Sequence, residues 1–337
     1  MAATNAQLRL KDYPEGEVKD TDFDVTTEAV PEPGPGEVLV RNHYVSADPS
    51  SRTYWNDGGN YHVMVKPGQI ITVGTGGEVI ASNNPDFAPG DMVTGGVGIQ
   101  DYNLSDGSGL TKVDTSLAPL SSWMGGLGIT GLTAYFGLLD VGKPQPGETV
   151  VVTAAAGAVG MITGQIARIK GARAVGVTSS EEKCRFLTEE LGFDGAVNYK
   201  DDLYGGLREC TPDRIDIVFD NVGGPMLDTI MRRLAMHSRI LISGATSQYN
   251  SERIYGPSNY LALATWRSRM EGFIIFDYED QYADAQREMA GWVKEGKLKL
   301  RENIVDGEVG DYPAVMRQLY AGENIGKMLM RLPGAHT

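Results

Sequence analysis

The 337-residue chain has few of the side chains that bind metals or form disulfides. It contains two cysteines, Cys184 and Cys210, and four histidines. The cysteines do not form a C-x-x-C pair, which excludes a structural zinc site built on cysteine ligands. No histidine lies at a familiar metal-ligand spacing from a cysteine or a carboxylate, and this disfavours zinc-activated alcohol chemistry. We expect no metal site in this protein.

Basic charge and long apolar runs are also scarce. Lysine and arginine number 30 against 44 aspartate and glutamate residues, and the net charge of −14 argues against a general nucleic-acid or anionic-membrane binder. No apolar run approaches the roughly 20 residues of a membrane span, and the N-terminal residues lack a secretory apolar core. We therefore expect a cytoplasmic protein with neither a nucleic-acid nor a membrane partner.

The segment from Thr149 to Gly160 is the most informative part of the chain. Val150 to Val152 form an apolar, β-branched run, and the small-residue turn Ala155-x-Gly157-x-x-Gly160 follows it. A helical pattern then places isoleucines 162, 166 and 169 on one face. A strand, a tight turn and a helix in this order predict a dinucleotide-binding site with the pyrophosphate at the helix N-terminus. The alternative is a glycine-rich turn without a ligand.

The residues after the next strand favour NADP(H) over NAD(H). The strand expected over Ala174–Thr178 ends in Ser179 and Ser180, without the carboxylate that usually holds a ribose 2′-hydroxyl. Lys183 follows in the first turn of the next helix. Hydroxyls and a nearby cation suit a 2′-phosphate, so we expect NADP(H) as the cofactor. The alternative is that Ser179 and Glu182 form a capping box and that Lys183 is solvated.

The hydrophobic pattern divides the chain into two domains. Apolar runs separated by proline and glycine turns indicate a β-rich, barrel-like domain over residues 1–125, to which residues 303–337 return. Over residues 126–302, strands alternate with helices, which predicts an α/β fold with a doubly wound parallel Rossmann sheet. The expected strands are Val150–Thr153, Ala174–Thr178, Gly195–Asn198, Ile215–Asp220, Arg239–Ser243 and Phe273–Phe276, and the expected helices are Trp123–Leu139, Ser180–Leu191, Met226–Met236 and Asp280–Glu295.

A series of short motifs runs along the chain: Ala154-Ala-Ala-Gly-Ala-Val-Gly160, Glu182-Lys-Cys184, Leu191-Gly-Phe-Asp194, Asn198-Tyr-Lys200, Phe219-Asp-Asn-Val-Gly-Gly224, Ser243-Gly-Ala245, Gln248-Tyr-Asn250 and Gly322-Glu-Asn-Ile-Gly-Lys327. Their order resembles that of the medium-chain dehydrogenase/reductase superfamily. The motifs are most similar to those of its zinc-free alkenal and enone reductases. This group includes leukotriene B4 12-hydroxydehydrogenase (prostaglandin reductase), plant double-bond reductases and bacterial curcumin reductase. The resemblance covers nearly the whole chain.

The resemblance implies a GroES-like barrel, a Rossmann domain and a set of NADP(H)-binding residues. Gly157, Ala158, Val159 and Gly160 would lie under the pyrophosphate, and Lys183, beside Ser179, would pair with the 2′-phosphate. Tyr199 would lie near the adenosine ribose phosphate and Tyr249 by the cofactor phosphates. The other residues that the resemblance implies at the cofactor are Asn221, Gly244, Phe273, Ile274, Ile275 and Asn324.

One motif departs from the family pattern. Many relatives carry Asp-Pro-Tyr-Met-Arg in the first domain, with the tyrosine facing the substrate. The corresponding stretch here is Asp48-Pro-Ser-Ser-Arg52, so that Ser50 takes the place of the tyrosine. Tyr54 and Trp55 follow closely and could substitute for it if the loop shifts. The departure leaves the substrate and the proton donor open.

The resemblance implies NADPH-dependent reduction of the carbon–carbon double bond of α,β-unsaturated aldehydes or ketones, with hydride added to the β-carbon. This reaction needs a hydrogen-bond donor at the carbonyl oxygen, either a ribose hydroxyl of the cofactor or a tyrosine phenol. Our first candidate for a tyrosine donor is Tyr278, and Tyr54 is the second. The alternatives are quinone reduction, zinc-free oxidation of a secondary alcohol, and NADPH binding without catalysis.

The resemblance also implies a homodimer joined edge to edge through the return segment and the Arg267–Phe276 region. The glycine-rich stretch Gly95–Gly109 reads as a long loop that could cover the substrate pocket.

Overall fold

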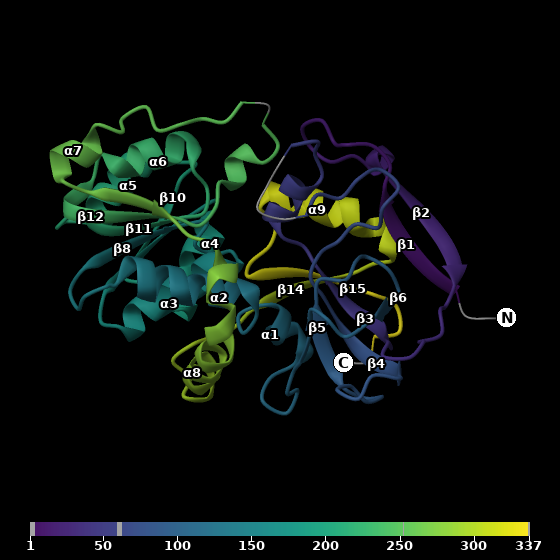
Figure 1. Ribbon diagram of the computed structural model, residues 1–337. Helices are drawn as coiled ribbons and strands as arrows, with labels where there is room; N and C mark the ends of the chain where they lie inside the picture. The colour runs from purple at the N-terminus through teal and green to yellow at the C-terminus, as the bar shows by residue number, and fades with distance from the viewer. Residues whose placement is uncertain (1–3, 59–62, 252, 336–337) are drawn as a thin grey trace. The chain divides into compact units, whose positions relative to one another are not determined.

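The computed structural model describes residues 4–58, 63–251 and 253–335, and the chain divides into two compact units (Figure 1). The first unit contains residues 1–124 and 302–337, and the second contains residues 125–301. Each division lies one residue before the boundary that the sequence predicts. The C-terminal segment therefore belongs to the same unit as the N-terminal half of the chain.

The first unit is built on a sheet of seven strands in the order β14-β15-β3-β4-β5-β7, with β6 paired to β3. The return strand β15 runs antiparallel to β3, with Leu329 opposite Ser46. The strands β1 and β2 form a separate, two-stranded antiparallel sheet. The strands are β1 (Thr4–Leu10), β2 (Phe23–Ala29), β3 (Val38–Ser46), β4 (Thr75–Ser82), β5 (Met92–Gly95), β6 (Tyr102–Ser105), β7 (Leu110–Lys112), β14 (Glu302–Asp306) and β15 (Lys327–Arg331). The helical segments are η1 (Asp20–Asp22), η2 (Pro49–Tyr54), α1 (Leu120–Met124), η7 (Val309–Asp311) and α9 (Tyr312–Ala321).

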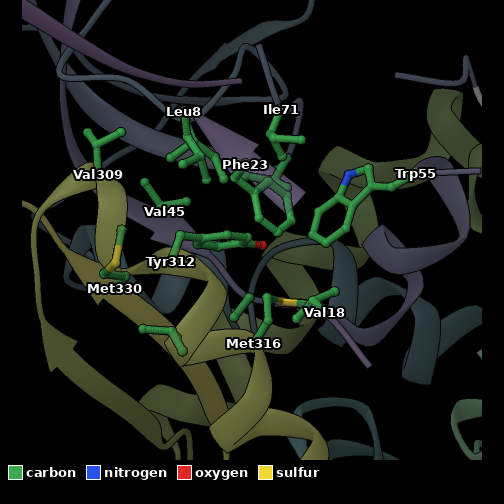
Figure 2. Close-up of a cluster of buried hydrophobic side chains, with 14 of the residues drawn as sticks. Leu8, Val18, Phe23, Val45, Trp55, Ile71, Val309, Tyr312, Met316 and Met330 are labelled. Carbon is green, nitrogen blue, oxygen red and sulfur yellow. The ribbon is translucent and has the colours of Figure 1, made fainter. Parts of the chain in front are cut away.

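The core of the first unit is aromatic at its centre. Trp55 is fully buried and packs edge-on against Phe23, with the ring centroids 5.5 Å apart, and against Tyr312 at 6.4 Å. Figure 2 shows these three rings among the aliphatic side chains of the same cluster. Because Trp55 fills this core, the expectation that it could replace the missing tyrosine at Ser50 is wrong.

The second unit contains a six-stranded parallel sheet in the order β10-β9-β8-β11-β12-β13, which confirms the predicted doubly wound α/β fold. Figure 1 shows α5 and α6 on one face of the sheet and α3 on the other. The strands are β8 (Thr149–Thr153), β9 (Arg173–Thr178), β10 (Gly195–Asn198), β11 (Ile215–Asp220), β12 (Leu234–Ile242) and β13 (Arg269–Gly272). The helical segments are α2 (Ile129–Phe136), η3 (Gly137–Gly142), α3 (Ala158–Ile169), α4 (Glu181–Arg185), η4 (Phe186–Glu190), α5 (Leu203–Cys210), α6 (Gly224–Met231), η5 (Thr246–Gln248), α7 (Ala262–Trp266), η6 (Ile275–Gln281) and α8 (Tyr282–Lys294).

The last strand of the second unit is not where the sequence predicts it. The expected strand Phe273–Phe276 is wrong, because β13 ends at Gly272 and Ile275 begins the 3-10 helix η6. The Phe273 ring instead packs against Phe219, with the centroids 6.1 Å apart, and lies over Gly137, where a Cβ would overlap it. A short apolar run shows that a segment is buried but does not distinguish a strand from a packed turn.

Three expected helices differ from the structure in extent. The expected helix Trp123–Leu139 is interrupted between α1 and α2, where the Gly126 carbonyl lies so close to Gly131 that a Cβ there would overlap it. The expected helix Ser180–Leu191 ends as the π turn η4. Met226–Met236 stops at Met231, since Leu234 already begins β12.

The stretch Gly95–Gly109 is not one long loop. Its middle forms β6, which pairs antiparallel with β3. Just before β6, the buried Gln100 side chain accepts hydrogen bonds from Asn5 at 3.0 Å and from Gln7 at 3.1 Å, and it donates to Asn103. The expectation of a continuous covering loop is therefore wrong, because these buried amides fix the segment to β1 and β3.

Candidate functional site

The phosphate-binding turn joins β8 to α3. Gly157 is the N-cap of α3, and no side chain caps the helix there, so the amide groups of its first turn remain available. Gly157, Ala158 and Val159 are half-buried, whereas Gly160 is buried. A Cβ on Gly160 would lie 2.7 Å from the Ala155 Cα and closer still to the Ala154 carbonyl oxygen, whereas a Cβ on Gly157 would meet only that oxygen, at 3.2 Å. Gly160 thus permits close packing, and Gly157 leaves open backbone for a ligand.

A buried polar network lies at the carboxyl ends of β8 and β11. The Thr153 hydroxyl donates to Asp220 Oδ1 at 2.8 Å and accepts the Asn221 backbone N–H at 2.8 Å. Asp220 also accepts the backbone N–H groups of Val222 and Gly223. The Asn221 amide nitrogen donates to the Thr153 carbonyl at 2.8 Å, which leaves the Asn221 amide oxygen as the acceptor that this side chain can present. Burial raises the pKa of Asp220 above its usual value.

Lys183 and Lys200 lie at the carboxyl ends of β9 and β10. These strands pair in parallel with Thr178 opposite Asn198, so that the residues after both strands meet at one sheet edge. Burial, and then the neighbouring charge of Lys200, lowers the pKa of Lys183. Ser180 rather than Ser179 caps α4, its hydroxyl accepting the Lys183 N–H at 3.3 Å. The alternative capping box of Ser179 and Glu182 is therefore wrong, and two cations in this position fit an anionic 2′-phosphate.

The remaining expected cofactor residues of the second unit also follow its strands. Tyr199 comes directly after β10 and is 40% exposed. Tyr249 folds back over the end of β12, where its hydroxyl accepts the Ala245 N–H at 3.0 Å beside Gly244. Phe273 and Ile274 come directly after β13 and are half-buried, and Ile275 is buried. Each of the six parallel strands is therefore followed by expected cofactor residues, at the edge where open α/β sheets bind ligands.

The two candidate proton donors and Asn324 lie in different settings. Tyr278, in the second unit, stacks on Phe136 with the ring centroids 4.5 Å apart, and its hydroxyl donates to Asp140 at 2.8 Å. Burial and this hydrogen bond raise the pKa of Tyr278 to about 12. Tyr54 belongs to the first unit, where it ends η2 and packs against the aromatic core. Asn324, in the same unit, is 7% exposed, and its amide donates to the Gly326 carbonyl at 2.7 Å.

Two groups of polar residues that the fold brings together are not among the residues predicted from the sequence. One is the Thr153–Asp220 pair, and its signal is a polar residue directly after each of the apolar runs at residues 150–152 and 217–219. The other is the ion pair of Asp48 and Lys327, in which Lys327 is 2% exposed. These two residues are far apart in sequence and belong to two separate motifs, and no spacing rule links them.

Neither a metal-ligand cluster nor a membrane-spanning helix occurs in the part of the chain that the structure describes. Among those residues, no three or more histidine, cysteine, aspartate or glutamate side chains assemble as metal ligands. No helix within them is long and apolar enough to cross a membrane.

Comparison with known proteins gives matches over most of the chain. Residues 6–113 match a family model described as the N-terminal domain of oxidoreductase, and residues 158–291 match one described as zinc-binding dehydrogenase. The NADPH-dependent curcumin reductase of Escherichia coli is 41% identical over 98% of this chain and 97% of its own. The 2-alkenal reductase (NADP(+)-dependent) of Nicotiana tabacum is 38% identical over 97% of both chains.

The same similarity holds in three dimensions. The crystal structure of CurA from Vibrio vulnificus in complex with NADPH is 37% identical and superposes with a TM-score of 0.92, covering 97% of this chain and 99% of that one. Sequence and structure thus match over nearly the full length of these relatives. The chain belongs to the zinc-free medium-chain dehydrogenase/reductase family that includes the curcumin, alkenal and prostaglandin reductases.

Proposed function

We propose that this protein, an NADP(H)-dependent oxidoreductase, reduces the carbon–carbon double bond of α,β-unsaturated aldehydes and ketones. The observation that carries the proposal is that relatives matching nearly the whole chain at 38–41% identity are named 2-alkenal reductase and curcumin reductase. Within the chain, the open turn at Gly157 fits the pyrophosphate of NADPH, and the cations Lys183 and Lys200 fit its 2′-phosphate.

The proposed cofactor site uses the carboxyl edge of the parallel sheet. The turn from Gly157 to Gly160 would hold the pyrophosphate with backbone N–H groups, and Lys183, with Ser179 beside it, would bind the 2′-phosphate. The Asn221 amide oxygen would accept a hydrogen bond from a hydroxyl or carboxamide of the cofactor. Tyr199, Gly244, Tyr249, Phe273, Ile274, Ile275 and Asn324 would complete the site. When bound, NADPH supplies the hydride that adds to the β-carbon.

The protein must then stabilise the charge that develops on the carbonyl oxygen and deliver a proton. A donor fixed in a dry pocket is most effective for this purpose. We place a tyrosine hydroxyl in this role, from Tyr54 or Tyr278. The Tyr278 hydroxyl already donates to Asp140, and burial together with this hydrogen bond raises the pKa of Tyr278 to about 12, which disfavours it as a proton donor. We therefore propose Tyr54 as the donor.

The experiment that tests the function follows NADPH absorbance with a panel of enals, enones, a quinone and secondary alcohols, with NADH in parallel. We expect rapid NADPH oxidation with the enals or enones and slow oxidation of NADH. Turnover with only the quinone or only an alcohol would keep the cofactor assignment but reject the double-bond reduction. Tight NADPH binding without any turnover would favour a non-catalytic binding protein.

We also infer a homodimer and a cytoplasmic location. The strand β13 is the outer strand of its sheet, with β12 as its one neighbour among the strands of the described residues. An unpaired strand edge can pair with the same edge of a second copy. Light scattering tests the dimer, and fractionation of the source cells tests the location.

A further inference from the structure

The buried ion pair of Lys327 and Asp48 joins two segments of the first unit. Lys327 begins the return strand β15 and is the last residue of the motif that contains Asn324. Asp48 precedes η2, the short helical turn that carries Ser50 and Tyr54. The Lys327 ammonium contacts an Asp48 carboxylate oxygen and also donates to the Ala47 carbonyl at 3.2 Å. The Lys327 side chain is 3% exposed, so water cannot replace its partner easily.

The Asp48 carboxylate does not cap the helical turn that follows it. An aspartate at the N-cap position usually accepts a backbone N–H of the turn that follows. Asp48 occupies the N-cap of η2 but makes no side-chain capping bond. Its second oxygen instead accepts the Ser46 hydroxyl, so that both carboxylate oxygens point toward the ends of β3 and β15. The orientation of η2 is thus set by the return strand rather than by local capping.

Two tyrosines of α9 hold the same turn from the other side. The Tyr312 hydroxyl, at the centre of the aromatic core in Figure 2, donates to the Ser46 carbonyl at 2.9 Å. The Tyr320 hydroxyl donates to the Pro49 carbonyl at 2.7 Å. The segment from Ser46 to Pro49 is therefore fixed by β15 and by α9, and both of these elements come from the returning C-terminal segment.

We infer that the Lys327–Asp48 ion pair is a positioning element that fixes the η2 turn to the Asn324 motif. The inference rests on the proposed function, in which Tyr54 of η2 is the proton donor and Asn324 belongs to the cofactor site. Because the pair is the one salt bridge between these two segments among the described residues and is buried, its loss should loosen η2 relative to the Asn324 motif while the backbone contacts remain. Lys327 acts through these residues and does not itself touch the reacting atoms.

Lys327→Met tests the role, because it removes the charge and keeps most of the side-chain length. With the acceptor that the wild type turns over fastest, we expect kcat/KM to fall about 10–100-fold, chiefly through a higher KM for the acceptor. The Kd for NADPH should stay within about twofold, since the pyrophosphate and 2′-phosphate sites lie in the second unit. Arg331→Met is the matched control: Arg331 lies on the same strand and pairs with Asp306 at 2.6 Å on the surface. It should leave kcat/KM unchanged.

A second measurement needs no substrate and therefore separates this inference from the proposed function. In hydrogen exchange, Lys327→Met should speed exchange of the backbone N–H groups of Ser51 and Trp55, which bond to the Asp48 and Arg52 carbonyls. Exchange in β4 should not change. Unchanged exchange around η2, or wild-type kcat/KM in the folded variant, would overturn the inference.

If Lys327→Met alone does not fold, the double variant Asp48→Asn with Lys327→Met leaves no unpaired buried charge. The same loss of kcat/KM and the same faster exchange are then expected. A double variant with wild-type values of both would overturn the inference.

Discussion

At the scale of single residues, we propose that Lys183 determines the preference for NADP(H) over NAD(H). We expect Lys183→Gln to raise the Kd for NADPH roughly 10–100-fold, because a hydrogen bond to a charged group is worth about 1.5–3 kcal/mol. The Kd for NADH should change little, since NADH has no 2′-phosphate. Fluorescence titrations with both cofactors measure the effect. Lys294→Gln, an exposed position on α8, is the control with the same change in net charge. An equal loss for NADPH and NADH would contradict the assignment.

The lowered pKa of Lys183 also predicts a pH dependence of binding. Burial and the charge of Lys200 lower this pKa below the usual 10.5. Binding of the 2′-phosphate needs the protonated amine. The affinity for NADPH is therefore highest below the pKa of Lys183 and falls as the pH rises through that pKa. We therefore expect the preference for NADPH over NADH to decline at a lower pH than an ordinary lysine would allow. Lys183→Arg, which stays charged, should remove the decline. Titrations at several alkaline pH values measure it, and a preference that is constant with pH would refute the interpretation.

The proton donor can be identified by paired tyrosine substitutions. We expect Tyr54→Phe to lower kcat about 10²–10⁴-fold, the usual contribution of a general acid. Tyr278→Phe should have a smaller effect, because its hydroxyl already donates to Asp140 and its pKa is raised to about 12. Steady-state rates, with NADPH affinity measured as a control for folding, compare the two. A larger loss in Tyr278→Phe would reverse the assignment.

At the scale of elements, we propose that the two glycines of the turn between β8 and α3 have different roles, Gly160 in packing and Gly157 in ligand binding. Gly160→Ala places a Cβ against Ala154 and Ala155, and we expect it to lower the free energy of unfolding by about 1–3 kcal/mol, as overpacking does. Gly157→Ala meets only the Ala154 carbonyl oxygen, at 3.2 Å. It should leave stability nearly unchanged but weaken NADPH binding, because its Cβ occupies the space offered to the pyrophosphate. Thermal unfolding and NADPH titration distinguish the two. Equal loss of stability in both variants would contradict the division of roles.

The same elements show how far the sequence predicts the structure. The central strands were predictable, because β8 and β11 are β-branched and buried on both faces, as parallel strands are. The edge strand β13 was not predictable, because its residues are mostly exposed and the apolar run that follows it packs in a turn. The interruption of the expected helix near Gly126 depends on a close backbone approach, which periodicity does not report.

At the scale of the whole molecule, sequence order predicted which residues follow the parallel strands but not what those residues contact. Asn221 comes directly after β11, Gly157 lies in the turn after β8 and Lys183 in the helix after β9, and a parallel sheet brings such positions to one edge. Two buried polar contacts, the Thr153–Asp220 network and the Lys327–Asp48 pair, instead join parts of the chain that are distant in sequence. Only the folded chain brings these partners together.

At the same scale, we expect two chains to assemble through β13. Light scattering at micromolar concentration should give twice the chain mass of 36.4 kDa. Successive residues of a strand direct their N–H groups to opposite edges. One of the two variants Met270→Pro and Glu271→Pro therefore removes a donor from the outer edge, while the other removes one that faces β12. We expect the variant that loses the outer-edge donor to be a folded monomer that still binds NADPH. A wild-type mass of 36.4 kDa, or a dimer that survives both substitutions, would exclude β13 as the dimer contact.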